Sequence, residues 1–560
     1  MRVACLALVA LLWFGALTPQ VGLAAEVSKA PLQKQTAFAE NPIVYFLMTD
    51  RFLNGNPKND ASYGRKKDGQ KEIGTFHGGD FAGITQKLKE GYFRDLGVNA
   101  LWITVPFEQI HGYTVGGGGK DTFAHYPYHG YFVLDFTRLD ANWGTENELR
   151  EMIDTAHAQG IRVLFDVVMN HPGYADMQTL NEYGVDVLKE GWQNATLSNF
   201  HSFIDYKSNN WANWWGPQWV RAGLGGGYEN GGKGNLTMQV AYLPDFKTES
   251  EEPVDLPPIL KAKKDTRAKA IEGYSVRQYL SKWMTDWVRE YGVDGFRCDT
   301  AKHVEMKSWA LLKQDGVKAL KDWKAKNPTK KIDDADFWTV AEVFPHGVNK
   351  DAYFTAGGFD SVLNFEFQDA ADRPEGLDSV YSQMASRLID QKFDVLSYLS
   401  SHDTRLFDRA NLINGGSALM LAPGGVQIYY GDETARPAGP SSRADREQAT
   451  RSDMNWSEAN ADVLAHWKIL GQFRLRHPAI ARGEHQRLSE QPYVFTRMAK
   501  TDRVVVGMNV PADAAIPVEP AFTDGAKLRD AYTGARYVVK AGKVTVKPGR
   551  YGLVLLEAAP

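Results

Sequence analysis

Cysteine is nearly absent from this chain. Its 560 residues include 2 cysteines, Cys5 and Cys298. Cys5 lies in an N-terminal leader, so the mature chain keeps Cys298 alone and forms no internal disulfide. Because an exported protein without disulfides depends on burying apolar surface, we expect a large core, and hydrophobic residues make up 43% of the sequence.

The sequence has no excess of basic residues. Lysine and arginine total 64 against 68 aspartate and glutamate, which gives a formal net charge of −4. Nucleic acids and anionic membrane surfaces are recognised by clustered positive charge. The composition therefore argues against both as partners.

Long apolar runs are also lacking, apart from one at the N-terminus. Arg2 precedes an apolar run at 3–17, and small residues follow at 22–25. This pattern is typical of a secretory signal peptide cleaved after Ala24 or Ala25. A membrane anchor is the alternative, but the run is short and no stop-transfer flank follows. We expect a periplasmic or secreted protein without a membrane anchor.

Short apolar runs alternate with amphipathic helical stretches from Pro42 to Tyr430. This alternation predicts a parallel (β/α)8 TIM barrel. An open doubly wound sheet would give a similar pattern and remains an alternative. The eight strand-like runs are residues 43–48, 98–103, 161–168, 293–298, 337–341, 359–365, 395–399 and 426–430.

More than a hundred residues separate the third run from the fourth, far beyond a usual βα loop. We expect them to form a lobe near the carboxyl ends of the strands. After about residue 478 the alternation stops, and strand-like runs with turns predict an antiparallel β domain. The predicted segments are a signal peptide (1–25), the barrel (26–171 and 266–482), the inserted lobe (172–265) and a C-terminal β-sandwich (483–560).

The segment GFRCDTAKH at 295–303 reads as a buried strand that ends in charge. Arg297 and Asp299 are two residues apart and share one face of a strand. A neighbouring arginine favours the ionised carboxylate and lowers its pKa, as a nucleophile requires. A buried structural ion pair explains this segment equally well.

Further acidic residues follow other predicted strands. Asp166 marks the third, Glu342 ends the fifth and Asp403 follows the seventh. In a barrel the strand ends converge on one face, and a pair of carboxyl groups there suits a glycosidase. Glu342 follows an apolar run, so we expect burial to raise its pKa and fit it to protonate a leaving oxygen.

Seven segments, in order, resemble the α-amylase superfamily of glycoside hydrolases. Within it, GTFHGGD at 74–80, LSYLSSHDT at 396–404 and TRSDMNW at 450–456 look most like the periplasmic α-amylases of Gram-negative bacteria. The seven are GVNALWITVP at 97–106, YHGY at 128–131, DVVMNH at 166–171, LPD at 243–245, GFRCDTAKH at 295–303, AEV at 341–343 and SHD at 401–403.

The resemblance implies roles for individual residues. Asp299 would be the nucleophile, Glu342 the general acid/base and Asp403 the stabiliser of the transition state. Asp166 would be structural. Arg297 would keep Asp299 ionised and oriented. The residues implied to bind substrate are Tyr128, His129, Tyr131, His171, Arg297, Lys302, His303 and His402.

The resemblance also implies Ca²⁺, a cation that prefers oxygen ligands. One site would join barrel and lobe through Asn170, Asp245 and the main-chain carbonyl of His303. A second resembles a site of cyclodextrin glucanotransferases, although its loop reads equally well as an ordinary turn-rich segment. Its ligands would be Asn54, Asn56, Asn59, Asp60, Gly78 and Asp80.

These features together lead us to expect a monomeric, retaining, endo-acting α-amylase that hydrolyses α-1,4 bonds of starch-derived maltodextrins. The alternatives are an α-glucanotransferase or cyclomaltodextrinase with the same carboxylates, and a non-catalytic glucan-binding protein on the same fold. The presence of Asp299, Glu342 and Asp403 together argues against the last of these.

Overall fold

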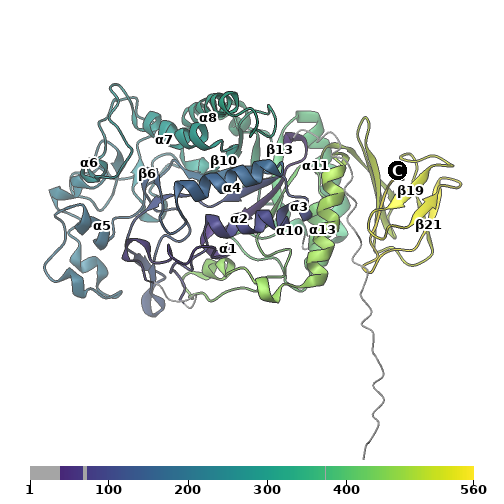
Figure 1. The fold of residues 1–560 in the computed structure, drawn as a ribbon, viewed down its shortest axis with the longest axis horizontal. Coiled ribbons are helices and arrows are strands. Elements are labelled where there is room, and N and C mark those ends of the chain that lie inside the picture. The colour runs from purple at the N-terminus through teal and green to yellow at the C-terminus, as the bar shows by residue number, and fades with distance from the viewer. Residues whose placement is uncertain (1–37, 67–71, 372–373, 560) are drawn as a thin grey trace, which may run out of the picture. The chain divides into compact units, whose positions relative to one another are not determined.

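The computed structural model describes residues 38–66, 72–371 and 374–559 (Figure 1). The predicted signal peptide at 1–25 lies outside these ranges. Among the helices of the described ranges, none combines the length and apolar character needed to cross a membrane.

Eight parallel strands close into a barrel in the order β1-β14-β13-β12-β11-β10-β7-β2. β1 pairs with both β2 and β14, so the sheet has no free edge. This closure confirms the predicted barrel and excludes the open sheet. The strands are β1 (Ile43–Leu47), β2 (Ala100–Ile103), β7 (Arg162–Val168), β10 (Gly295–Asp299), β11 (Trp338–Ala341), β12 (Ser361–Asn364), β13 (Asp394–Tyr398) and β14 (Gly425–Tyr429).

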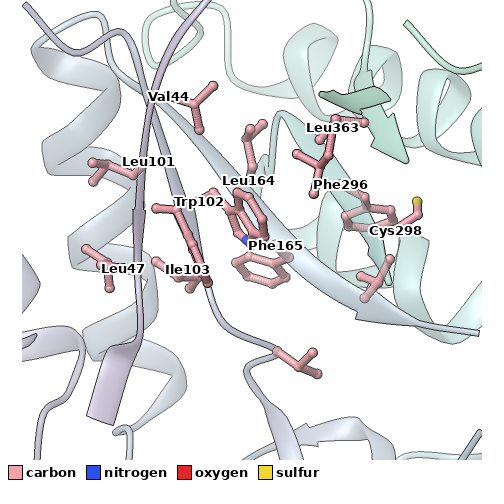
Figure 2. Packing of buried hydrophobic residues seen from close by; sticks show 14 of the residues in the cluster. Val44, Leu47, Leu101, Trp102, Ile103, Leu164, Phe165, Phe296, Cys298 and Leu363 are labelled. Atoms are coloured by element: carbon pink, nitrogen blue, oxygen red, sulfur yellow. The ribbon is translucent and has the colours of Figure 1, made fainter. Parts of the chain in front are cut away.

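The barrel strands are buried along their whole length, as expected for parallel strands covered by helices. Trp102 on β2 pairs in register with Leu164 on β7, and Figure 2 shows the two side chains close together. Trp102 also stacks on Phe46 with ring centroids 3.8 Å apart. Cys298 on β10 is buried, as a small apolar residue would be.

Helices surround the strands, and their ends carry the expected signals (Figure 1). Ser275 forms a capping box with Gln278, and Gly292 closes the same helix with φ 81°, a conformation that favours glycine. The longer helices are α2 (Phe81–Lys89), α4 (Glu146–Ala158), α7 (Val276–Tyr291), α8 (Met306–Lys326), α11 (Leu377–Gln391), α12 (Leu412–Met420) and α13 (Ala461–Arg476). The shorter ones are α1 (Thr49–Phe52), α3 (Tyr92–Asp95), α5 (Met177–Glu182), α6 (Pro258–Ala262), α9 (Ala352–Thr355), α10 (Phe367–Ala371) and α14 (Ala479–Arg482).

The segment between β7 and α7, hereafter the lobe, is mostly turns around the short strand pair β8 (Val220–Arg221) and β9 (Asp245–Phe246). Trp214, Trp215 and Trp219 are almost completely buried. Trp219 stacks on Trp283 of α7 with centroids 5.5 Å apart and planes 2° from parallel. An aromatic contact therefore fastens the lobe to a barrel helix.

Two further strand pairs lie between β2 and α4. β3 (Phe107–Gln109) pairs with β6 (Val133–Leu139), and β4 (Thr114–Gly116) pairs with β5 (Phe123–His125). The turn between β5 and β6 carries Tyr128, His129 and Tyr131.

The C-terminal strands are antiparallel and have a hydrophobic cluster of their own. Six of them form one sheet in the order β15-β16-β17-β22-β19-β20, and β18 pairs with β21. The antiparallel domain is confirmed, and the four predicted segment boundaries stay predictions. The strands are β15 (Glu484–Ser489), β16 (Tyr493–Met498), β17 (Arg503–Met508), β18 (Ala514–Pro517), β19 (Lys527–Asp530), β20 (Arg536–Val538), β21 (Lys543–Val546) and β22 (Val554–Ala558).

Candidate active site

One guanidinium joins the ends of three neighbouring barrel strands. Nη1 of Arg297 on β10 donates to Asp166 Oδ1 at 2.9 Å and to Asp299 Oδ1 at 2.6 Å. Its Nη2 lies 2.9 Å from Oε2 of Glu342, the residue after β11. The register of β10 against β7 sets Arg297 directly opposite Asp166. The pairing of β7, β10 and β11 thus brings together carboxylates that are far apart in the sequence.

Burial controls the protonation of this group. It raises the pKa of Glu342 to about 7, while the attraction of Arg297 acts in the opposite direction and the charges of Asp299 and Asp403 add to the rise. The expected raised pKa of Glu342 is therefore confirmed. Such a group can hold a proton near neutrality and release it.

The expected lowering of the Asp299 pKa is wrong. Burial raises it to about 6, and Arg297 offsets only part of this effect. The sequence argument counted the neighbouring cation but not the loss of water around a side chain whose residue is only 6% exposed. Asp299 nevertheless remains more acidic than Glu342, so near neutral pH it is the more fully ionised of the two.

Asp403, which follows β13, has the opposite environment. Burial alone would raise its pKa, but His402 and Arg451 outweigh burial and hold the pKa far below its usual range. His402 Nε2 lies 3.0 Å from one carboxylate oxygen, and Arg451 Nη2 donates to the other at 2.9 Å. Asp403 is consequently an anion throughout the physiological pH range.

The predicted sugar-binding residues cluster around these carboxylates. The Tyr131 hydroxyl donates to Asp166 Oδ2 at 2.8 Å and lies 2.8 Å from His402 Nε2. The backbone N–H of Tyr131 donates to Nδ1 of His129 at 3.0 Å. Burial lowers the pKa of His171 to about 4 and that of His129 well below its usual value. Both rings are therefore neutral near pH 7 and can exchange hydrogen bonds with hydroxyl groups.

Several of these side chains line a cavity of about 1360 Å³. On the cavity wall, His171 Nε2 is buried and has no hydrogen-bond partner among the described residues. Nδ1 of His402, a residue behind this wall, is buried and unpartnered in the same way. Buried polar atoms normally find partners, so these nitrogens are available to a polar ligand. The predicted residues on the cavity wall are His129, Tyr131, His171, Asp299 and Asp403.

Five predicted substrate residues do not line this cavity. Two of them, Arg297 and His402, instead contact the carboxylates Asp299 and Asp403 that do. Tyr128 is fully buried, its hydroxyl donates to Gln448, and Arg51 lies over its ring at 3.8 Å. Lys302 Nζ donates to the carbonyl of Phe344 at 3.1 Å, and His303 Nδ1 lies 2.8 Å from the carbonyl of Asn235. The contacts of Tyr128, Lys302 and His303 indicate that these side chains stabilise neighbouring segments of the protein.

Sequence reasoning missed Arg451 and the whole lobe side of the cavity. Arg451 lies within the TRSDMNW segment that carries the resemblance, yet no pattern links it to Asp403, 48 residues earlier. The lobe residues have irregular spacing and gave no periodic signal. The lobe wall includes Phe200, His201, Tyr206, Trp211, Leu224 and Tyr242.

Two of the predicted metal ligands between barrel and lobe, Asn170 and Asp245, lie close together, and the guanidinium of Arg221 already pairs with Asp245. Oδ1 of Asn170 is buried and accepts no hydrogen bond within the described ranges. The N–H of Phe246 donates to the Asn170 carbonyl at 2.9 Å, which brings β9 beside this residue. Arg221, across the strand pair from Asp245, donates to Asp245 Oδ2 at 2.9 Å. The free amide oxygen fits a metal ion, whereas the guanidinium supplies part of the positive charge such an ion would bring.

The second predicted metal loop is organised by Asp80. Its carboxylate accepts hydrogen bonds from the backbone N–H groups of Gly55 at 3.0 Å, Asn56 at 2.8 Å and Gly83 at 2.7 Å. The Asn59 side chain adds a longer one at 3.3 Å. Asp80 is thus also the N-cap of α2.

The remaining predicted ligands of this loop also lie together. Asn54 donates to Asp60 Oδ1 at 2.9 Å, and a Cβ added at Gly78 would come within 2.4 Å of the Asn54 side chain. Oδ1 of Asn54 and Oδ1 of Asn59 are both buried and lack a partner in the described part of the chain. Two buried amide oxygens beside carboxylates fit a hard cation, although no cluster of three or more His, Cys, Asp or Glu is found among the described residues.

Comparison with known proteins agrees with the resemblance found in the sequence. The alpha-amylase catalytic domain family matches residues 46–252 and 270–465. The periplasmic alpha-amylase of Escherichia coli (strain K12) is 50% identical over 492 residues, covering 83% of this chain and 71% of that protein. A cyclomaltodextrin glucanotransferase of Thermoanaerobacterium thermosulfurigenes is 27% identical over 508 residues, covering 83% of this chain and 59% of that protein.

A solved structure shares the fold at low sequence identity. The alpha-amylase of Anoxybacillus superposes with a TM-score of 0.62 at 22% identity, covering 94% of this chain and 99% of that one. This likeness concerns the fold alone.

Proposed function

The chain belongs to the alpha-amylase family of glycoside hydrolases, and we propose that it hydrolyses α-1,4-glucosidic bonds of starch-derived maltodextrins with retention of configuration. One observation carries the proposal: the Arg297 guanidinium contacts both Asp299 and Glu342. A retaining glycosidase needs two carboxyl groups close together, one as nucleophile and one as acid.

In the first step Asp299 attacks the anomeric carbon while the bond to the leaving glucosyl oxygen breaks. Glu342 gives its proton to that oxygen, so the departing chain leaves as a neutral alcohol. The product is a β-glucosyl ester of Asp299. The different pKa values of the two carboxyl groups assign these roles. Asp299 is the more acidic of the pair and serves as the nucleophile, whereas Glu342 keeps its proton to higher pH and serves as the acid.

In the second step Glu342, now a carboxylate, takes a proton from water. The resulting hydroxide-like oxygen attacks the anomeric carbon and the ester bond to Asp299 breaks. Two inversions at one carbon restore the α-configuration. The free carboxylate of Asp299 is then paired again with Arg297.

Asp403 would stabilise the positive charge that develops on the sugar ring, since it stays anionic beside His402 and Arg451. His171 and His402 would bind hydroxyl groups through their unpartnered nitrogens, and Tyr131 would stack on the ring. Asp166 receives hydrogen bonds from Arg297, Tyr131 and Trp102. We assign it the task of holding Arg297, not a chemical step.

We propose that Ca²⁺ supports this architecture. At the lobe junction Asn170, Asp245 and the carbonyl of His303 would hold it. The second site would use Asn54, Asn56, Asn59, Asp60, Gly78 and Asp80. When bound, the ion would supply positive charge that ties these loops together, and Arg221 shares that task at Asp245. We further propose that the protein is periplasmic, because the Escherichia coli relative is a periplasmic alpha-amylase. We also propose that it is a monomer.

The product profile of the purified protein on maltoheptaose and soluble starch tests this function. Short linear maltodextrins released in the α-configuration are expected. Cyclic or elongated products would assign the chain to the transferases instead. Tight glucan binding without any products would show that the carboxylates serve recognition alone.

A further inference from the structure

One arginine is completely buried after the last barrel strand. Arg436 has no exposed surface, and it forms no ion pair with a carboxylate in the described part of the chain. The charges of Asp432 and Glu433 favour its ionised form, but the hydrogen bonds of these carboxylates go to groups such as Arg409 and Tyr45. Burying a charge away from a direct counter-ion is costly. The hydrogen bonds of the guanidinium must offset that cost.

These hydrogen bonds go to three backbone carbonyls and one hydroxyl. Nε of Arg436 donates to the Tyr430 carbonyl at 2.9 Å, and Nη1 donates to the Ser452 carbonyl at 3.0 Å and to the Ser452 hydroxyl. Nη2 donates to the Thr450 carbonyl at 3.2 Å. A Cβ added at Gly431 would lie 2.3 Å from Nε, so glycine leaves the room that this side chain needs. Arg436 therefore fastens the segment 450–452 to the end of β14.

The two residues that Arg436 holds in this segment are the immediate neighbours of Arg451. Arg451 donates through Nη2 to Asp403 Oδ1 at 2.9 Å and through Nε to the His402 carbonyl at 3.1 Å. The hydroxyl of Thr450 donates to the same carbonyl at 2.8 Å. Contacts thus connect Arg436, through residues 450–452, to the carboxylate of Asp403.

We propose that Arg436 is a positioning residue for the reaction: it fixes the backbone on both sides of Arg451, and Arg451 in turn keeps Asp403 oriented toward the sugar ring. The proposal rests on the proposed function, in which Asp403 stabilises the charge of the transition state. Such stabilisation depends on groups that are held in place before the reaction. An arginine suits this task because its planar fork reaches several acceptors in fixed directions, which the single ammonium of lysine does not.

The test measures kcat and KM on maltoheptaose for Arg436→Gln. Because Asp403 acts on the transition state, we expect kcat to fall about ten- to a hundredfold, with KM changed by less than about twofold. Arg436→Lys keeps the charge without the fork, so it should recover only part of kcat.

A milder variant keeps the test decisive if Arg436→Gln does not fold. The Tyr430 hydroxyl donates to the Ser452 carbonyl at 2.7 Å, beside the bond from Arg436. Tyr430→Phe removes this one hydrogen bond from the same segment. Its kcat should fall about two- to tenfold, again with little change of KM.

Arg474→Gln is the matched control. Arg474 is also completely buried, and its guanidinium also holds backbone carbonyls, those of Met420, Ala422 and Gly424 in the segment before β14. The loss of these hydrogen bonds should lower Tm and leave the kcat of the folded enzyme at the wild-type value. A kcat loss in Arg474→Gln equal to that in Arg436→Gln would overturn the positioning role.

Arg451→Ala separates positioning from general destabilisation. If Arg436 acts through Arg451, adding Arg436→Gln to Arg451→Ala should lower kcat by a smaller factor than Arg436→Gln does in the wild-type background. The same factor in both backgrounds, or a wild-type kcat in both Arg436→Gln and Tyr430→Phe, would overturn the proposal. A wild type that cleaves no α-glucan would instead refute the proposed function, and this is recognised before any variant is compared.

Discussion

The pH dependence of kcat/KM follows directly from the paired environments of Asp299 and Glu342. The active form has Asp299 ionised and Glu342 protonated. Burial sets the pKa of Asp299 to about 6 and that of Glu342 to about 7. Activity should therefore be lost below pH 6 as Asp299 gains a proton, and lost above pH 7 as Glu342 releases one.

These two pKa values predict a narrow bell-shaped dependence of kcat/KM on pH. At pH 6.5 about 60% of molecules hold the active combination of protons, and two pH units away on either side about 3% do, so kcat/KM should fall roughly twentyfold at pH 4.5 and pH 8.5. Because the two groups interact, the limbs report apparent pKa values of the pair. Initial rates on maltoheptaose at substrate concentrations well below KM measure this profile.

The Glu342→Gln variant distinguishes the acid limb of the pH profile, assigned to Asp299, from the alkaline limb, assigned to Glu342. The variant cannot give a proton, so we expect kcat on maltoheptaose to fall by about 10² to 10⁴, with glucan binding retained. On an aryl α-maltoside, whose leaving group needs no proton, the first step should recover and the limb near pH 7 should vanish. A flat wild-type profile from pH 5 to pH 9, or an alkaline limb that persists in Glu342→Gln, would refute the assignment.

Three other perturbations have definite expected outcomes. Asp403→Asn should keep the fold, measured by circular dichroism, and lower kcat/KM at least about a hundredfold, because it removes the charge that faces the developing cation; a loss below tenfold would contradict its role. Ser275→Ala should lower the free energy of unfolding by about 1 kcal/mol in denaturant titration, because the capping box of α7 is lost; Ser379→Ala at an exposed α11 position is the control. Chelation with EDTA should lower Tm, and added Ca²⁺ should restore it; an unchanged Tm would argue against both proposed metal sites.

The barrel was predictable because its strands are short apolar runs separated by helices with clear ends. The C-terminal sheet was predicted only in part, because the sequence shows strand-like runs only at residues 493–498, 503–509, 543–547 and 551–556. β15 (EHQRLS) is polar and half-exposed, and β18, β19 and β20 are short and only partly buried, so none of them forms a continuous apolar run. A fully buried strand leaves a continuous apolar run in the sequence, whereas a half-exposed strand that is held by pairing with its neighbours does not.

The positions of the carboxylates were predictable, whereas their energetics were not. The strand ends placed Asp299, Glu342 and Asp403 on one face, but the depth of burial that raises the Asp299 pKa depends on residues from the whole barrel. Arg451 and Arg221 likewise act on partners distant in sequence. Long-range contacts of this kind leave no local signal.

The lobe leaves the barrel after β7 and rejoins it at α7, while the register between β7 and β10 keeps Arg297 opposite Asp166. The reacting groups are therefore carried by the barrel strands, whereas the lobe supplies part of the cavity wall that faces them. Descendants of such a gene can explore new preferences for chain length while inheriting the bond-breaking chemistry intact. For an engineer, the lobe is the segment to exchange and the strand pair beneath it is the segment to leave alone.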